Sequence, residues 1–154
     1  MAGQNNKKQT TEPHKNRREH KQMTKNMITK ITALYARSAA PNPENIRRQR
    51  NSLTNFAAMN GFNDLRYYSD DGYAGTNTNR PAYQQMMEDI RNDKVSVLLV
   101  RDMARLTRNM KDHAQLYKEL DMHGVRLITL NEKIDRLPAS GLRCELHDVL
   151  AGKF

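Results

Sequence analysis

Short apolar runs along the middle of the chain predict four β-strands. They cover residues 28–35 (ITKITALY), 62–68, 95–100 (VSVLLV) and 125–130 (VRLITL), and they are rich in residues that strands favour. The run 95–100 is almost continuously apolar, which is typical of a strand buried on both faces of a sheet. We therefore expect a largely parallel sheet with this strand inside it.

Between these runs, apolar residues recur at helical spacing and predict three helices. The first occupies residues 42–61 and begins with a capping side chain, Asn42, followed by Pro43. The second covers 81–92, and the third covers 103–123. The side chains expected to face the core are Ile46, Leu53, Phe56, Ala57, Tyr83, Met86, Met87, Ile90, Met103, Leu106 and Met110.

Strands that alternate with helices of this length indicate an α/β fold. We expect a three-layer sandwich with a mostly parallel four- to five-stranded sheet over residues 28–139, and the 154-residue length suits one domain. Residues 1–27 almost lack apolar side chains and are expected to form a disordered basic tail. Residues 140–154 carry apolar side chains at helical spacing and are expected to start an amphipathic helix that is truncated at Phe154.

Positive charge is concentrated in the tail. The chain has a formal net charge of +9, and residues 1–30 hold eight Lys or Arg against two Glu. A basic tail binds nucleic acid by releasing counterions, so the candidate contacts there are Lys7, Lys8, Arg17 and Arg18. A solubilising extension is the alternative that charge alone leaves open.

The sequence also carries signals about its compartment. A single cysteine, Cys144, excludes an internal disulfide and favours a reducing compartment. No apolar run is long enough for a transmembrane helix, and the polar N-terminus does not look like a secretory signal. We therefore expect a soluble, cytoplasmic protein.

Four arginines follow the predicted strands, where ligands bind to parallel sheets. Arg37 follows the first strand, Arg80 lies in the long polar loop after the second, and Arg105 and Arg108 follow the third. Arg105 and Arg108 are three residues apart and would share one face of a helix. Converging guanidinium groups suit a phosphodiester, and unrelated arginines on a solvated surface are the alternative.

Two polar residues near the first strand are further candidates. Gln49 lies three residues after Ile46 and four before Leu53, inside the apolar stripe of its helix. A buried amide needs partners, so Gln49 is expected to reach the strand ends and orient an arginine or a phosphate, unless it is peripheral and hydrated. Ser38 directly follows Arg37 and is the candidate nucleophile, unless it is only a hydroxyl in a turn.

Acidic residues near the strand ends raise the alternative of a metal site. Asp70, Asp71 and Asp102 could hold Mg²⁺ for phosphoryl transfer, although Asp-Asp-Gly is also a common turn signal. The five histidines have no ligand spacing among themselves or with Cys144, and there is no Walker-type loop. We therefore expect no metal.

Four segments of the chain match motifs of a known family. They are LYARSA with Gln49 and Leu53 downstream, YSDDGYAGTNTNRPAY, VLLVRDMARLTRN and HGVRLITLNEKID. Together they resemble the catalytic domain of serine site-specific recombinases, the resolvase/invertase group, and look most like the large serine recombinases of mobile elements. The resemblance covers about residues 29–150, with the motifs in family order and at family spacing.

The resemblance implies a reaction on DNA. A serine hydroxyl attacks a phosphodiester, forms a 5′-phosphoserine link and frees a 3′-hydroxyl, and religation reverses the step. It implies double-stranded DNA as partner, no cofactor, no small-molecule substrate and no membrane. The residues it assigns are Arg37, Arg80, Arg105 and Arg108 for neutralising transition-state charge, Gln49 as a supporting polar group and Asp71 for orienting the arginines.

The chain departs from the family pattern at two positions. The family's serine lies two residues after the arginine, where this chain has Ala39, and Ala104 replaces the usual Ser or Asp before Arg105. Either the first strand ends at Arg37 and the loop brings Ser38 into place, or the chain has lost its nucleophile. If the strand continues, Ser38 faces away from Arg37.

The resemblance also implies how the protein assembles and where it acts. A long helix after the last strand drives dimerisation in this family, so we expect a homodimer or tetramer formed through residues 140–154 in a protein of the bacterial nucleoid. Two other functions stay open. One is an inactive homologue or fragment that binds DNA or a partner recombinase, and the other is a metal-dependent nuclease that uses the three aspartates.

Overall fold

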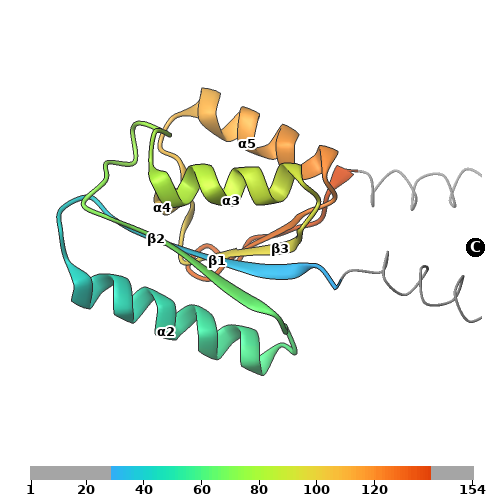
Figure 1. Cartoon of the computed structure of the whole chain (residues 1–154), viewed down its shortest axis with the longest axis horizontal. Helices are drawn as coiled ribbons and strands as arrows, with labels where there is room; N and C mark the ends of the chain where they lie inside the picture. Colours follow the sequence, from blue (N-terminus) through green and yellow to red (C-terminus); the bar gives the residue numbers. More distant parts are fainter. Residues whose placement is uncertain (1–28, 140–154) are drawn as a thin grey trace, which may run out of the picture.

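The computed structural model describes residues 29–139, which form a five-stranded sheet between two layers of helices (Figure 1). The strand order is β2-β1-β3-β4-β5. The first four of these pair in parallel, and β5 runs antiparallel to β4. The strands are β1 Ile31–Ser38, β2 Leu65–Asp71, β3 Val95–Val100, β4 Arg126–Thr129 and β5 Asp135–Arg136. This confirms the predicted α/β sandwich with a mostly parallel sheet, while the predicted basic tail and C-terminal helix lie outside the described residues.

Helices cover both faces of the sheet. Helix α2, Pro43–Met59, lies on one face, and α3, Pro81–Arg91, lies with α5, Met110–Met122, on the other (Figure 1). The short helix α4, Met103–Leu106, sits at the end of the sheet where β3 finishes and contacts β1. Within the described residues, no helix is long and apolar enough to cross a membrane.

The helix ends follow from local chemistry. The Asn42 side chain accepts a hydrogen bond from Asn45 N (3.1 Å) at the start of α2, and Pro43 occupies the first turn. At its other end, Gly61 adopts a positive φ of 73° and Phe62 N donates to Ala57 O (2.9 Å). Helix α2 therefore begins and ends close to where the sequence predicts.

The core divides into two clusters, one on each face of the sheet. Ala33 and Tyr35 of β1 pack beneath α3 and α5, whereas Leu34 packs beneath α2, as the alternation of side chains along a strand requires. The predicted inward residues of α3 (Tyr83, Met86, Met87 and Ile90) are all buried. Of the predicted stripe on α2, Ile46, Leu53 and Ala57 are buried, and Phe56 packs partly against the core.

Strands β1 and β2 extend further toward their carboxyl ends than their apolar runs predict. β1 covers 31–38 rather than 28–35, and β2 covers 65–71 rather than 62–68. Apart from Ala36 the added residues are polar, but their backbones pair in register, Arg37 with Asp70 and Ser38 with Asp71. Apolar runs therefore mark only part of these strands and miss their polar ends, which are largely buried and form the site.

The prediction of one helix over 103–123 is wrong. Thr107 and Asn109 are extended, with φ of −145° and −112°, and they separate α4 from α5. A continuous helix would use the carbonyls of residues 104–106 to accept amides four residues later. Guanidinium groups of Arg37 and Arg80 take these carbonyls instead, and the Asn109 side chain caps α5 by accepting from Asp112 N (2.7 Å).

This break changes the placement of three predicted residues. Arg105 lies in α4 and Arg108 lies in the extended linker, so the two do not share a helical face. Met110, predicted to pack with Met103 and Leu106, is 86% exposed at the start of α5. Met103 and Leu106 do pack against the core.

Candidate active site at the carboxyl edge of the sheet

The candidate site lies where β1 and β3 separate. The chain order reverses at this point of the sheet, because β2 pairs on one side of β1 and β3 on the other. The last paired residues of the two strands are Tyr35 and Val100, and beyond them the backbones diverge. Crevices of this kind, at the carboxyl ends of parallel strands, are where ligands bind in such folds.

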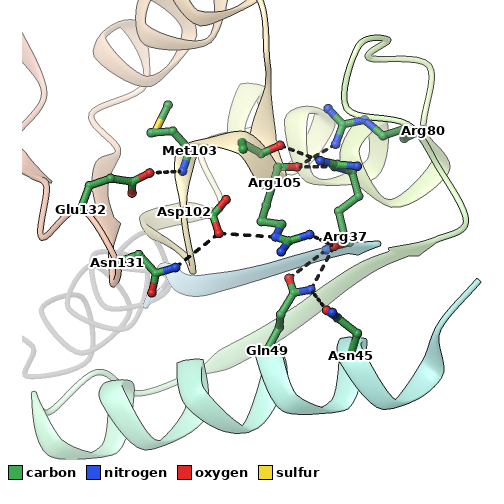
Figure 2. Close-up of polar contacts among 10 residues, drawn as sticks. Arg37, Asn45, Gln49, Arg80, Asp102, Met103, Arg105, Asn131 and Glu132 are labelled. Carbon is green, nitrogen blue, oxygen red and sulfur yellow. Dashed lines mark hydrogen bonds and ion pairs between the residues drawn. The ribbon is translucent and has the colours of Figure 1, made fainter. Parts of the chain in front are cut away.

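Gln49 of α2 occupies the gap that β3 leaves beside β1. Its Oε1 accepts from Arg37 N (3.2 Å) and its Nε2 donates to Arg37 O (3.0 Å), with a further donation to Asn45 Oδ1 (2.5 Å) (Figure 2). The side chain is completely buried, as its place in the apolar stripe predicts. Its amide satisfies backbone groups that would otherwise be buried without partners.

The side chain of Arg37 is buried and donates only to backbone carbonyls among the described residues. Nε donates to Arg105 O (3.0 Å), Nη1 to Tyr73 O (3.0 Å) and Nη2 to Ala104 O (2.6 Å). Burial, and then the neighbouring charge of Arg80, lower the pKa of this guanidinium below its ordinary value. Arg37 therefore joins β1 to α4 and to the loop after β2, and it would have to leave these carbonyls to contact a phosphate.

Arg80 is buried in the same way from the other side of α4. Its Nη1 donates to Tyr35 Oη (2.7 Å) and Arg105 O (3.0 Å), its Nε donates to Asn77 O (2.9 Å), and its Nη2 donates to Leu106 O. The guanidinium also lies 4.4 Å from the centre of the Tyr83 ring. The two buried arginines thus hold the carboxyl end of α4 between them.

Tyr35 connects Arg80 to Asp70. Its hydroxyl donates to Asp70 Oδ2 (2.7 Å), and the same carboxylate accepts from the amides of Ala82 and Tyr83 (both 2.9 Å) at the start of α3. Burial raises the pKa of the Tyr35 hydroxyl well above its ordinary value, against the opposing charge of Arg80. Asp70 therefore caps α3, a contribution that its Asp-Asp-Gly context in the sequence does not reveal.

Arg105 keeps contact with solvent at the crevice, unlike Arg37 and Arg80. Its Nη1 donates to Arg37 O (3.1 Å), beside Gln49, and its Nε lies 3.5 Å from Asp102 Oδ2 (Figure 2). About a quarter of its side chain is exposed (24%). Arg108 is exposed in the linker between α4 and α5. These two arginines can donate to an oxyanion at the crevice.

Ser38 continues β1 and lies on the opposite face from Arg37. It pairs with Asp71 in the strand register, so its side chain points to the α2 face with Leu34. Its hydroxyl donates to Ala40 O (2.7 Å), and the residue is only 7% exposed. The strand therefore does not end at Arg37, and Ser38 faces away from Arg37, as expected for a strand that continues.

The aspartates do not gather in one place. Asp71 Oδ1 accepts from Asn42 N (2.7 Å), and it is Asp70, not Asp71, that connects through Tyr35 to an arginine. Asp102 lies on the far side of the crevice, beside Arg105. Among residues 29–139, no group of three or more His, Cys, Asp or Glu side chains is placed to hold a metal ion.

Three residues of this site were not predicted from the sequence. Tyr35 reads as a core residue, and Asn131 and Glu132 lie in a short turn after β4. Asn131 Nδ2 lies 3.5 Å from Asp102 Oδ2, and Glu132 Oε1 accepts from Met103 N (3.1 Å). No apolar pattern points to residues of a turn, and only the pairing of β3 with β4 brings them to α4.

Comparisons with known proteins agree on the family. The sequence model described as "Resolvase, N terminal domain" matches residues 32–151. The solved N-terminal catalytic domain of TP901-1 integrase is 33% identical, with a TM-score of 0.64, over 69% of this chain and 82% of that chain. The C-terminal catalytic domain of ISC1926 TnpA, an IS607-like serine recombinase, is 25% identical, with a TM-score of 0.60, over 64% and 67%.

A more distant structure shares the fold. A resolvase family site-specific recombinase from Streptococcus pneumoniae is 23% identical, with a TM-score of 0.58, over 80% of this chain and 93% of that chain. A search of curated proteins found no match.

Proposed function

Because the chain belongs to the resolvase family and is a site-specific recombinase catalytic domain, we propose that it binds a DNA phosphodiester at the β1–β3 crevice without cleaving it. The observation that carries the proposal is the orientation of Ser38. Its hydroxyl lies on the α2 face and donates to Ala40 O, whereas Arg37 lies on the other face. Residue 39, where the family resemblance requires the nucleophile, is an alanine.

Binding to DNA rests on Arg105 and Arg108. Both lie at the carboxyl edge of the sheet, and both are accessible to solvent, unlike Arg37 and Arg80. The planar guanidinium group of arginine donates in pairs to phosphate oxygens. Arg37 and Arg80 support binding indirectly, because their hydrogen bonds hold α4, the helix that carries Arg105.

The absence of cleavage follows from the geometry of attack. An attacking oxygen must lie about 3–3.5 Å from phosphorus and in line with the leaving group. A side chain on the opposite face of a strand is displaced by several ångströms and points away. Ser38 therefore contributes a hydrogen bond within the turn after β1, and it does not serve as a nucleophile.

The test combines a binding and a trapping experiment. DNA affinity is measured by fluorescence anisotropy with a nicked duplex in low salt, and covalent adducts are trapped by denaturing the occupied complex. We expect salt-sensitive binding, weakened several-fold by Arg105→Ala and by Arg108→Ala, and no adduct from the unmodified chain or from Ser38→Ala.

Two variants sharpen the outcome. Ala39→Ser puts a hydroxyl at the position of the family's nucleophile, and an adduct in this variant alone would locate the missing group at residue 39. An adduct in the unmodified chain that disappears in Ser38→Ala would overturn the proposal and make Ser38 the nucleophile. Cleavage that is lost in EDTA would instead support the nuclease.

We infer further that residues 140–154 mediate self-association and that the basic tail adds non-specific DNA binding. Support for the first comes from the apolar residues at helical spacing, Leu142, Leu146, Val149 and Leu150. Deleting 140–154 should lower the mass measured by analytical ultracentrifugation. Deleting 1–27 should reduce the salt dependence of DNA binding, because fewer counterions are released.

A further inference from the structure

Helix α4 has only four residues, so it is held in place by contacts with other parts of the chain. The turn after β4 makes three hydrogen bonds to the end of β3, to the residue after it and to the first residue of α4. Leu130 N donates to Val100 O (3.1 Å) and Asn131 N donates to Arg101 O (2.9 Å), which extends the β3–β4 pairing past both strands. Glu132 Oε1 then accepts from Met103 N (3.1 Å), the first amide of α4 (Figure 2).

The same turn reaches the carboxylate that lies against Arg105. Asn131 Nδ2 lies 3.5 Å from Asp102 Oδ2, and this oxygen lies 3.5 Å from Arg105 Nε (Figure 2). Asp102 Oδ1 and Arg105 Nε are both buried and have no hydrogen-bond partner among the described residues. The contact between Arg105 Nε and Asp102 Oδ2 therefore depends on charge and on the groups that place the carboxylate, and Asn131 is one of these groups.

We propose that Glu132 and Asn131 are positioning residues that set the orientation of Arg105 toward DNA phosphate. Glu132 fixes the start of α4, and Asn131 holds Asp102, which lies against the guanidinium. At the tip of the same side chain, Arg105 Nη1 donates a hydrogen bond to Arg37 O (3.1 Å). The inference rests on the proposed function, because it assumes that Arg105 contacts the phosphate.

The role of Glu132 differs from that of an ordinary surface residue. Its hydrogen bond to Met103 N is exposed to solvent, so its loss should affect global stability little. The bond lies two residues from Arg105, so its loss should affect the orientation of that side chain more. The expected result is a change in DNA affinity at nearly unchanged melting temperature.

A double-mutant cycle in DNA affinity tests this role. The variants are Glu132→Ala, Arg105→Ala and the double substitution, with Glu132→Gln as the conservative variant and Glu88→Ala as a matched control on the exposed side of α3. We expect Glu132→Ala to weaken binding roughly threefold to tenfold in the unmodified background and to have almost no effect in the Arg105→Ala background. Glu132→Gln should restore binding, because its amide oxygen still accepts from Met103 N.

Each result separates the inference from the proposed function. If Arg105→Ala leaves affinity unchanged, the phosphate role of Arg105 fails, and the positioning role fails with it. If Arg105→Ala weakens binding but Glu132→Ala has the same effect in both backgrounds, only the positioning role is overturned. The positioning role is also overturned if Glu132→Gln weakens binding as much as Glu132→Ala does. It is overturned likewise if the control Glu88→Ala weakens binding as much as Glu132→Ala.

Asn131 is tested by its own cycle, with Asn131→Ala in the Asp102→Asn background. We expect Asn131→Ala to weaken DNA binding about twofold to fivefold, and to lose this effect once the Asp102 carboxylate has been replaced. An equal effect in both backgrounds would overturn the role of Asn131 and leave that of Glu132 standing.

Discussion

Gln49 makes with Arg37 the two backbone hydrogen bonds that a neighbouring strand would make. β3 pairs with β1 only as far as Tyr35, and the amide of Gln49 takes over where β3 departs. One side chain therefore takes the place of the departing strand and leaves no buried backbone group of Arg37 unpaired.

The first prediction concerns Gln49. Gln49→Ala should lower the free energy of unfolding by about 1–3 kcal/mol, because Arg37 N loses the Gln49 acceptor in a buried setting and Arg37 O keeps only Arg105 Nη1. Urea denaturation measures the change. Asn51→Ala, an exposed change on the same helix, is the control and should stay within about 0.5 kcal/mol. Equal effects of the two changes would contradict this account of Gln49.

A side chain at position 75 is predicted to clash with the guanidinium group of Arg37, so this position needs glycine. A Cβ at this position would lie 2.6 Å from Arg37 Nη2, 2.9 Å from Cζ and 3.2 Å from Ala104 O. Gly75→Ala should therefore destabilise the fold by about 1–3 kcal/mol, as overpacking does. Thermal unfolding measures it, with the exposed change Thr76→Ala as control. A Gly75→Ala variant as stable as the parent would mean that Arg37 is free to move aside.

Tyr35→Phe is predicted to destabilise the protein without altering its packing. It removes a hydroxyl that accepts from Arg80 and donates to Asp70, and the expected cost is about 1–3 kcal/mol. The difference in the free energy of unfolding between the parent and Tyr35→Phe should shrink above pH 10. Because burial raises the pKa of Tyr35 in the folded state, its contribution is present below the ordinary value of 10.0 and is lost as the pH rises further.

Urea unfolding of both proteins between pH 7 and 11 checks this prediction. Tyr73→Phe, at an exposed tyrosine, is the matched control. A Tyr35→Phe variant that matches this control at pH 7 would argue against the Tyr35 network.

The Asp121 carboxylate is predicted to stabilise the fold at neutral pH and to lose this contribution in acid. Hydrogen bonds from the Arg136 guanidinium (both 2.8 Å) hold the pKa of its carboxyl below the ordinary value of 3.8. A lowered folded-state pKa gives stability that is present above that value and lost as the pH falls through the folded-state pKa. Asp121→Asn should therefore be less stable than the parent at pH 7, and the difference should shrink toward pH 3.

Unfolding curves at a series of pH values test this dependence. Asp64→Asn is a suitable control, because Asp64 is exposed and has a φ of 53° that Asn also tolerates. A difference between Asp121→Asn and the parent that stays constant from pH 7 to pH 3 would rule out the carboxylate charge as its cause.

Most of the fold and part of the site could be predicted from the sequence. The apolar periods located the strands, and the place of Gln49 in an apolar stripe pointed to a buried amide with partners, which the structure confirms. The edge strand β5 was not foreseen, since it has two residues and no apolar run. Its register is supported by the Arg126–Asp135 pair, whose partners lie nine residues apart.

The break between α4 and α5 could not be read from local sequence. Residues 103–123 have helical spacing throughout, but the carbonyls of Ala104, Arg105 and Leu106 bind arginines from β1 and from the loop before α3. A local pattern reports what a segment prefers, and here distant side chains decide the outcome. The same limit hid Glu132, whose partner Met103 lies across the β3–β4 connection.

The capping of α4 by Arg37 and Arg80 bears on how related sequences evolve. Both arginines complete the fold through backbone carbonyls, so selection for folding alone would retain them after the nucleophile is lost. This chain has Ala39 together with both arginines, so under the proposed function it would be such a case. The presence of Arg37 and Arg80 therefore reports that α4 can fold in place, and it does not by itself report that a chain of this family cleaves DNA.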